Sequence, residues 1–173
     1  KKTLESVLSQ NFEDFEVIIV DDGSTDASFS VVKSFTDPRI KLFQQKNSGA
    51  SSARNFGISK SNSEYIALID ADDTWNNNHL EEFYKSIKLF PQASFFCNAY
   101  QLKLRENYTH NATYNLQEQH KTQIVEDYFK ASIIHPLAMT SGVAFTKQSF
   151  LDIGSFNTTI SSGQDIDLWI RFA

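Results

Sequence analysis

Residues 17–20, Val-Ile-Ile-Val, form a run of β-branched side chains that ends directly on Asp21-Asp22-Gly23. A continuous apolar run of this kind is typical of a strand buried on both faces of a parallel sheet. Residues 65–69, Tyr-Ile-Ala-Leu-Ile, repeat the pattern and run directly into Asp70. Because helices must cover both faces of such a sheet, the two runs predict an α/β fold.

Helical patterns separate the predicted strands. The spacing of Leu4, Val7 and Leu8 predicts a first helix, and N-cap chemistry at residues 24–26 predicts a second helix through about residue 35. Further helices are expected near residues 48–59, 80–87, 124–131, 147–153 and 165–172, with strands at 40–43, 93–99 and 139–145. The polar residues 105–123 predict a long loop or an irregular hairpin. The alternation predicts one Rossmann-like domain over residues 1–173, with a mostly parallel sheet flanked by helices.

The composition excludes several classes of protein. The formal net charge of -5 disfavours nucleic acid and other anionic ligands unless a bound cation reverses the local field. Cys97 is the only cysteine, which excludes an internal disulfide and multi-cysteine zinc sites and fits a reducing compartment. No run approaches the roughly 18 apolar residues of a membrane helix. We therefore expect a soluble, cytoplasmic protein that binds no nucleic acid.

Acidic clusters follow two of the predicted strands immediately, at Asp21-Asp22 and at Asp70-Ala71-Asp72-Asp73. In open α/β sheets ligands bind outside the carboxyl ends of the strands, so both clusters should share one rim. Carboxylates about 4 Å apart repel by roughly 4 kcal/mol at an effective dielectric constant near 20, and a divalent cation would offset this repulsion. Mg²⁺ and Mn²⁺ favour oxygen ligands and share their coordination with substrate phosphates. The residues alone predict a metal and phosphate site, although aspartates after strands also serve as turn residues and helix caps.

Four motifs in a fixed order carry a resemblance to a known family. They are Val20-Asp21-Asp22-Gly23-Ser24-Thr25-Asp26, Asn47-Ser48-Gly49-Ala50-Ser51-Ser52-Ala53-Arg54-Asn55, Asp70-Ala71-Asp72-Asp73 and Gly163-Gln164-Asp165-Ile166-Asp167-Leu168-Trp169. In this order and spacing the chain resembles the family 2 glycosyltransferases of the GT-A fold. Each motif alone is only moderately specific, and the resemblance covers nearly the whole chain. It implies a nucleotide-binding half at residues 1–100 and an acceptor and catalytic-base half at residues 101–173.

The resemblance implies a nucleotide-diphospho-sugar donor. Asp22 would contact the base, most often uracil, and Arg54 would lie near the base or the diphosphate unless it is a surface helix arginine. The Ser141-Gly142 turn resembles the segment that lines the donor sugar, although a plain tight turn is the alternative. Asp21 is expected to support the site and Trp75 to flank it.

The resemblance also divides the roles within the second acidic cluster. Asp72 would contact the ribose or a metal ion, and Asp73 would ligate the Mn²⁺ or Mg²⁺ ion that bridges the diphosphate. Asp70 would support them by hydrogen bonding.

Asp165 matches the family's general base, which removes a proton from the acceptor hydroxyl as that oxygen attacks the anomeric carbon. A single base implies inversion of configuration. Asp167 is expected to support the base, although Asp165 and Asp167 could instead be simple acidic residues in the first turn of a helix. Gln164 departs from the family pattern, because an acidic residue usually precedes the base.

A second departure is that the family usually begins with a strand, whereas this chain starts after that strand, in the first helix. We therefore expect a sheet that lacks this central strand. Any association with the inner face of a membrane would be peripheral and would be made by parts of the protein outside these residues. The expected activity is metal-dependent, inverting transfer of a hexosyl or N-acetylhexosaminyl group to a saccharide or lipid-linked acceptor in polysaccharide biosynthesis. Two rivals stay open: a nucleotidyltransferase, and a non-catalytic domain that binds nucleotide sugars.

Overall fold

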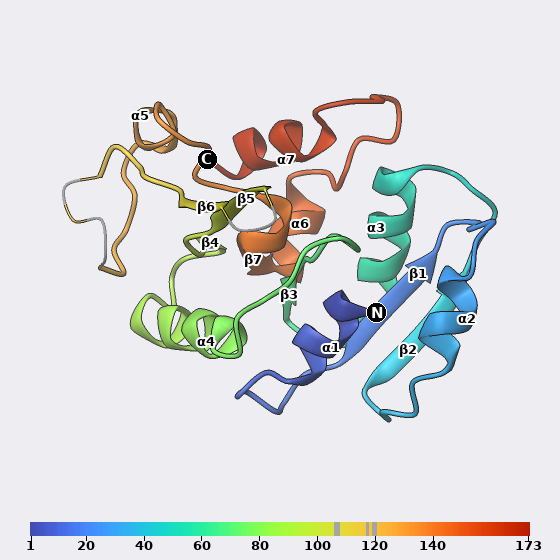
Figure 1. Cartoon of the computed structure of the whole chain (residues 1–173). Coiled ribbons are helices and arrows are strands. Elements are labelled where there is room, and N and C mark those ends of the chain that lie inside the picture. The colour runs from blue at the N-terminus through green and yellow to red at the C-terminus, as the bar shows by residue number, and fades with distance from the viewer. Residues whose placement is uncertain (106–107, 117, 119–120) are drawn as a thin grey trace.

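The computed structural model describes all residues except 106, 107, 117, 119 and 120. Its longer helices alternate with short strands along the first half of the chain, as the sequence predicts (Figure 1). The helices are α1 (Lys2–Leu8), α2 (Ser28–Lys33), α3 (Ala50–Lys60), α4 (His79–Leu89), α5 (Tyr128–Ala131), α6 (Lys147–Asp152) and α7 (Gln164–Phe172), with a 3₁₀ turn η1 (Thr140–Gly142). The strands are β1 (Val17–Asp21), β2 (Ile40–Gln44), β3 (Tyr65–Ala67), β4 (Phe95–Cys97), β5 (Gln101–Arg105), β6 (Tyr108–Asn111) and β7 (Val143–Thr146).

The strands pair in separate groups. β1 and β2 are parallel, with Val17 opposite Ile40. β7 lies between β3 and β4 and is antiparallel to both, so β3 and β4 point the same way. In the described part of the chain no strand ladder joins β1 to β3. The predicted α/β fold with a parallel sheet and helices is confirmed, while hydrogen-bonded parallel pairing is confined to β1 and β2.

Helix α3 packs directly against β1. The close approach is possible because Gly57 has no side chain: a Cβ built there would meet Val20 Cγ2 at 3.3 Å and Ile18 Cγ2 at 3.7 Å. A glycine in a helix interior costs about 1 kcal/mol relative to alanine. Here it allows the helix to lie close to the strand, as predicted for this small-residue segment.

The main core lies where α6 and α7 pack against β7. Its central side chains, Val143, Phe145, Phe150, Leu168 and Trp169, are each at most 1% exposed. By contrast, residues 17–20 of β1 are only partly buried. The expectation that this strand is buried on both faces is therefore wrong for the described residues, in which the only strand ladder of β1 is with β2.

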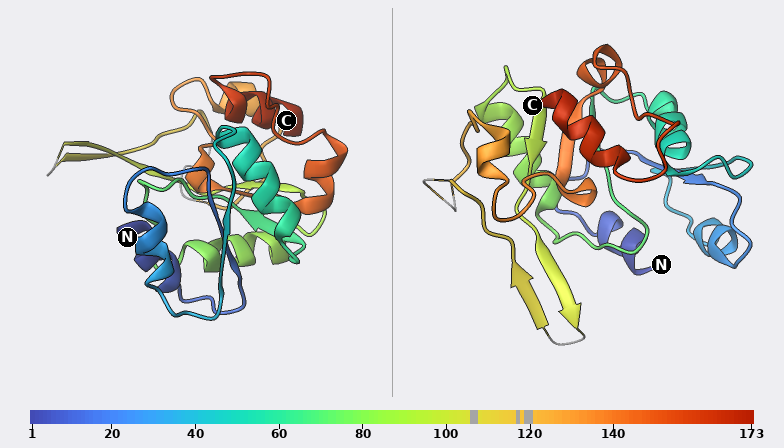
Figure 2. Two further views of the ribbon diagram at one scale, coloured as in Figure 1. Left: turned by 90° about the vertical axis from the view of Figure 1, so that its right-hand side faces the viewer. Right: turned by 90° about the horizontal axis from the view of Figure 1, so that it is seen from above.

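Several predicted elements differ in extent or type. The helix expected at residues 124–131 is confined to α5, whose N-cap Asp127 accepts a hydrogen bond from the Lys130 N–H. The strand expected at residues 139–145 begins only after η1. The polar stretch 105–123 contributes to the hairpin β5–β6, which projects from the body of the molecule (Figure 2). Residues 106, 107, 117, 119 and 120 of that stretch lie outside the described residues.

Helix α1 and the residues just after it dock on the segment that follows β3. The Gln10 side chain donates to the Asn76 carbonyl at 2.8 Å and accepts from the Leu80 N–H at 2.9 Å. The Thr3 hydroxyl donates to the Ala71 carbonyl at 2.7 Å. These bonds fix the path of the chain between the second acidic cluster and α4.

In the described part of the chain no helix is both long and apolar enough to span a bilayer.

Candidate active site

The turn after β1 orients two aspartates differently. Asp21 is buried and accepts from the Ser24 N–H and from Gln44 Nε2, and these hydrogen bonds lower the pKa of its carboxyl. Asp22 turns toward the start of α3, where its carboxylate accepts from the N–H groups of Ser48 and Gly49 at 2.9 and 2.8 Å. Asp21 therefore stabilises the turn, and Asp22 ties the turn to the loop before α3.

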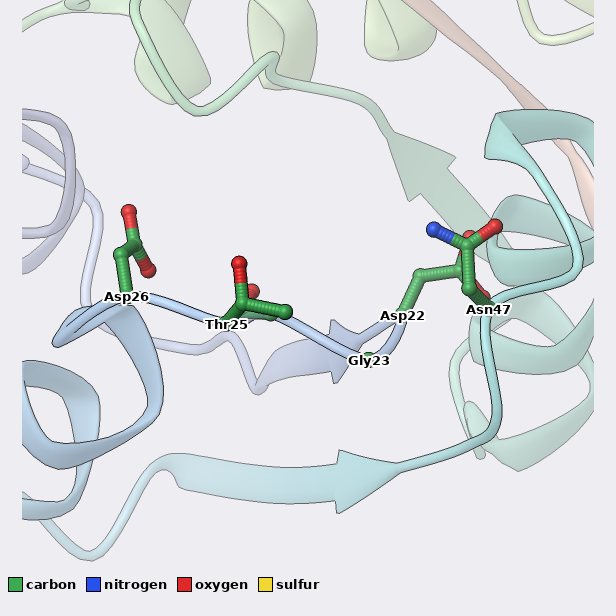
Figure 3. A pocket seen from close by; sticks show the side chains of 6 residues that line it. Asp22, Gly23, Thr25, Asp26 and Asn47 are labelled. Atoms are coloured by element: carbon green, nitrogen blue, oxygen red, sulfur yellow. The ribbon is translucent and has the colours of Figure 1, made fainter.

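Gly23 is required in this turn for two reasons. Its φ is +76°, a region that other residues rarely adopt, and a Cβ there would lie 2.9 Å from the Asn47 nitrogen. The loop after β1 and the loop before α3 therefore lie too close together at this point to leave room for a side chain on residue 23. Beside them lies a cavity of about 450 Å³ that is lined by residues 22–26 and Asn47 (Figure 3). Figure 3 shows Asp22 and Asn47 on the two neighbouring loops, with Thr25 and Asp26 further along the loop that follows β1.

Ser141 joins the two ends of the second acidic cluster. Its hydroxyl donates to Asp73 Oδ2 at 2.6 Å and accepts from the Asp70 N–H at 3.0 Å. Its carbonyl accepts from the Trp75 indole N–H at 2.6 Å. Arg54, on α3, pairs with Asp70 at 2.6 Å between Nη2 and Oδ1. The structure thus brings together five predicted site residues from three segments of the chain.

Gly142, the partner of Ser141 in the predicted turn, is buried. Its carbonyl accepts from the Asn98 N–H at 2.8 Å, and a Cβ on it would lie 3.2 Å from the Asn98 carbonyl oxygen. The turn is therefore pressed against the strand end of β4.

The second acidic cluster fits a metal ion whose coordination is completed by other groups. Asp72 and Asp73 are both exposed, and Asp73 uses one carboxylate oxygen for Ser141. Among the described residues no group of three or more His, Cys, Asp or Glu side chains is arranged to hold a metal ion. Mg²⁺ is commonly bound through one or two carboxylates together with water and substrate phosphates, which is the donor set that Asp72 and Asp73 can supply.

Asp165 and Asp167 lie in the first turn of α7, which begins after Gly163 in a left-handed conformation. Asp167 pairs with Arg171 at 2.6 Å, and Arg171 also donates to the carbonyls of Ile153 and Ser155. Asp167 therefore helps to fasten α7 to the end of α6. Asp165 is half-buried and takes no part in this network.

Asp165 contributes to the electrostatic surroundings of α5. The pKa of the Tyr128 hydroxyl on α5 is raised, first by burial and in smaller part by the negative charge of Asp165. The carboxylate of Asp165 therefore lies within electrostatic reach of α5, on the side of the molecule predicted to bind the acceptor.

A clamp from α3 holds the segment before α7. The Asn55 side chain donates to the Phe156 carbonyl at 2.9 Å and accepts from the Phe156 N–H at 3.0 Å. The Arg54 guanidinium lies 5.4 Å from the centre of the Phe156 ring. These contacts bring the N-terminal ends of α3 and α7 near each other.

Sequence reasoning missed the groups that hold the predicted residues. Gln45 donates to Asp22 Oδ1 at 2.8 Å, but a single glutamine in a loop has no pattern that would reveal this role. Asn55 is the last residue of the motif at residues 47–55, and its place in that motif could have indicated a structural role. His79 stacks on Trp75 with ring centres 4.5 Å apart. The two residues are four positions apart, but Trp75 precedes α4, so helical periodicity does not predict this contact.

The sequence matches the family model described as Glycosyl transferase family 2 over residues 1–147. An uncharacterized glycosyltransferase of Rickettsia bellii (strain RML369-C) is 33% identical over 179 residues, which span 99% of this chain and 24% of that relative. The chain thus covers about a quarter of the relative's length.

Two solved structures share the fold. S. aureus TarS in complex with UDP-GlcNAc matches with a TM-score of 0.79 at 21% identity, over 98% of this chain and 48% of that one. The mannosyltransferase PcManGT from Pyrobaculum calidifontis, in complex with GDP-Man and Mn²⁺, matches with a TM-score of 0.67 at 18% identity, over 99% of this chain and 47% of that one. These likenesses confirm the predicted GT-A fold.

Proposed function

This chain belongs to glycosyl transferase family 2, and on that premise we propose that it transfers a sugar from a nucleotide-diphospho-sugar to a hydroxyl group of an acceptor. The expected donor is a UDP-sugar that carries a hexosyl or N-acetylhexosaminyl group. The expected acceptor is a saccharide or a lipid-linked molecule. The expected reaction belongs to polysaccharide assembly in the cytoplasm or at the inner face of the membrane.

The observation that carries this proposal is a network of one ion pair and two hydrogen bonds. It links Arg54, Asp70, Ser141 and Asp73. The Ser141 hydroxyl and the Asp70 carbonyl hold Asp73 in the turn after β3, and Asp72 stands exposed beside it. TarS was solved with UDP-GlcNAc and PcManGT with GDP-Man and Mn²⁺. We extend that chemistry to this chain, with Asp73 and Asp72 holding Mn²⁺ or Mg²⁺ and Asp22 near the base.

In the proposed reaction Asp165 accepts the proton of the acceptor hydroxyl. The acceptor oxygen forms a bond to the anomeric carbon while the bond from that carbon to the diphosphate oxygen breaks, so the configuration inverts. A bound metal ion would neutralise the charge that develops on the departing diphosphate. Arg54 lies one turn of α3 from the loop that binds Asp22, where its positive charge favours the same diphosphate.

The first prediction concerns Asp73→Asn in the complete protein. Loss of one carboxylate charge should weaken donor binding at least tenfold when Mn²⁺ is present and have little effect when it is chelated. Calorimetric titration of a panel of nucleotide sugars, with and without Mn²⁺, measures both. Asp152→Asn, on α6, is the matched control, and equal binding by Asp73→Asn and this control would contradict the metal assignment.

The second prediction concerns Asp165→Asn. Removal of the general base should leave the donor Kd within about twofold and lower kcat by about 10²–10⁴-fold. Rates of release of free nucleoside diphosphate provide the measurement. Full activity in the variant would show that Asp165 is not the base.

The same assay separates the rival functions. Release of pyrophosphate instead of nucleoside diphosphate would establish a nucleotidyltransferase and overturn the proposal. Metal-dependent donor binding with neither hydrolysis nor transfer would establish a non-catalytic binding domain.

A further inference from the structure

Ser141 reaches the second acidic cluster from a distant part of the chain. It lies in η1, directly before β7, whereas the cluster forms the turn after β3. The backbone of that turn is closed by the Asp73 N–H, which donates to the Asp70 carbonyl at 3.2 Å. A bond between residues i and i+3 shapes the backbone of a turn and leaves its side chains free to rotate. The Asp73 side chain is held by Ser141 instead.

The hydrogen-bonding capacity of the Ser141 hydroxyl is used within the cluster. A serine hydroxyl has a single proton to donate. Here that proton goes to Asp73 Oδ2 at 2.6 Å, while the oxygen accepts from the Asp70 N–H at 3.0 Å. While it holds Asp73, this hydroxyl therefore cannot donate to a bound sugar.

The backbone around Ser141 is anchored from two sides. Its carbonyl accepts from the indole N–H of Trp75 at 2.6 Å, and the Trp75 side chain is buried. The next carbonyl, that of Gly142, accepts from the Asn98 N–H at 2.8 Å. Because these bonds hold the backbone of Ser141 without the help of Asp73, the hydroxyl is a fixed donor toward which the carboxylate turns.

The bond to Ser141 restricts an otherwise exposed carboxylate. Asp73 is exposed, and in the described part of the chain its second oxygen, Oδ1, makes no hydrogen bond. Carboxylates that bind metal ions usually accept hydrogen bonds from neighbouring groups, which fix their orientation. Removing such a neighbour commonly weakens metal binding by roughly 10–100-fold.

We propose that Ser141 is a positioning residue, whose hydroxyl orients the Asp73 carboxylate toward the divalent cation that accompanies the donor. The inference rests on the proposed function in one respect, because Asp73 is taken from it as a metal ligand. It assigns Ser141 a role that acts through Asp73 and requires no contact between the hydroxyl and the donor sugar.

The test measures Mn²⁺ binding to the complete protein in the presence of UDP, from the electron paramagnetic resonance signal of free Mn²⁺. Ser141→Ala should bind Mn²⁺ at least tenfold more weakly than the parent. Ser141→Thr keeps the hydroxyl and should bind within about threefold of the parent. Ser59→Ala, which removes a hydroxyl that donates to the Phe56 carbonyl within α3, is the matched control and should bind as the parent does.

Two results of this measurement would overturn the proposal. Mn²⁺ binding by Ser141→Ala that equals that of Ser59→Ala would show that Asp73 needs no help from the hydroxyl. Equal weakening in Ser141→Ala and Ser141→Thr would show that the hydroxyl is not the group that matters.

A second arm separates positioning from damage to the fold. If Ser141 acts through Asp73, then Ser141→Ala should weaken Mn²⁺ binding by less than about twofold when it is added to Asp73→Asn. Weakening by the same factor in both backgrounds would mean that the substitution acts elsewhere and would overturn the proposal.

The proposed function and the positioning role can fail separately, since Mn²⁺ binding needs no turnover. Mn²⁺ binding that depends on Ser141, without any sugar transfer, would overturn the proposed function and support the positioning role. Sugar transfer by a parent whose Mn²⁺ binding is unchanged in Ser141→Ala would support the function and overturn the positioning role. A parent that binds no Mn²⁺ with UDP would overturn both the metal assignment and the role of Ser141.

Discussion

At the scale of single residues, the Ser141 hydroxyl gives the second acidic cluster its shape. It accepts from the Asp70 backbone and donates to the Asp73 side chain, so one oxygen atom spans the turn between them. The sequence could propose Asp70, Asp73 and Ser141 as members of one site. It could not predict this bond, because Ser141 lies 71 positions from Asp70 along the chain and only the fold brings them together.

His79 is a second residue whose behaviour depends on the fold. Its ring contacts Trp75 and Phe83, its Nε2 is buried and has no hydrogen-bond partner among the described residues, and burial lowers its pKa to about 4. The unfolded chain binds a proton near the ordinary pKa of about 6.5, so stability is constant above that pH and falls as the pH drops toward 4.

From these pKa values we predict that the protein loses about 2 kcal/mol of stability between pH 7 and pH 5 through His79 alone. His79→Phe keeps an aromatic ring in the stack and removes the titration. Urea unfolding of the parent and the variant at both pH values measures the difference. Parallel pH profiles for the two proteins would show that His79 is not protonated on unfolding in this range.

At the scale of elements, the close approach of the turn after β1 to the loop before α3 depends on Gly23. Gly23 and Gly49 both have positive φ, at +76° and +86°. They differ in surroundings, since a Cβ on Gly23 would lie 2.9 Å from the Asn47 nitrogen and a Cβ on Gly49 would meet nothing within 4 Å.

This pair supports a matched prediction. Gly49→Ala should cost about 1–3 kcal/mol, for backbone strain alone, and Gly23→Ala should cost more than Gly49→Ala, because the two loops must also separate. Denaturant unfolding of both variants gives the two values. Equal destabilisation would mean that the loops separate without cost.

The type and order of the elements could largely be predicted from the sequence, whereas their ends could not. α3 and α4 lie where the periodicity places them, and α6 ends before Gly154, whose φ is +96°. The helix predicted at residues 124–131 shrinks to α5, since residues before Asp127 gain no helical hydrogen bonds and Asp127 caps the helix. The spacing of apolar residues cannot show where this helix begins, because the capping residue Asp127 lies inside the segment that the spacing predicts as helical.

At the scale of the whole molecule, burial is uneven. The most completely buried side chains gather around β7, α6 and α7, whereas β1 has partly buried residues throughout its apolar run and α2 has no buried residue. Regions with fewer buried apolar contacts open at lower free energy.

We therefore predict that β1 and β2 open before the sheet around β7. Hydrogen exchange of the backbone amides should give an opening free energy at least about 2 kcal/mol lower in β1 than in β7. Amides of α7 serve as an internal reference, because Leu168 and Trp169 lie in the same core as β7. Equal protection in the two sheets would show that they unfold as one unit.

The grouping of the strands could not be predicted from the sequence. Residues 139–145 are predicted as a strand, and part of the segment forms one, but the sequence pattern carries no information about its direction or its neighbours. β7 runs antiparallel between β3 and β4, strands that lie far earlier in the chain. The roles of Asp22, Asp72, Asp73 and Asp165 likewise stay predictions, since the fold brings residues together without showing what they bind.

The insertion of β7 between β3 and β4 also has a consequence for how the protein is made. The ribosome delivers residues 143–146 long after both neighbouring strands, so Ile66 and Phe96 leave the exit tunnel without the strand that will pair with them. Domains whose pairings are distant along the chain fold slowly and expose apolar strands until the last partner arrives. Synthesis therefore passes through a stage in which the growing chain depends on protection from aggregation, and that stage ends only when β7 emerges.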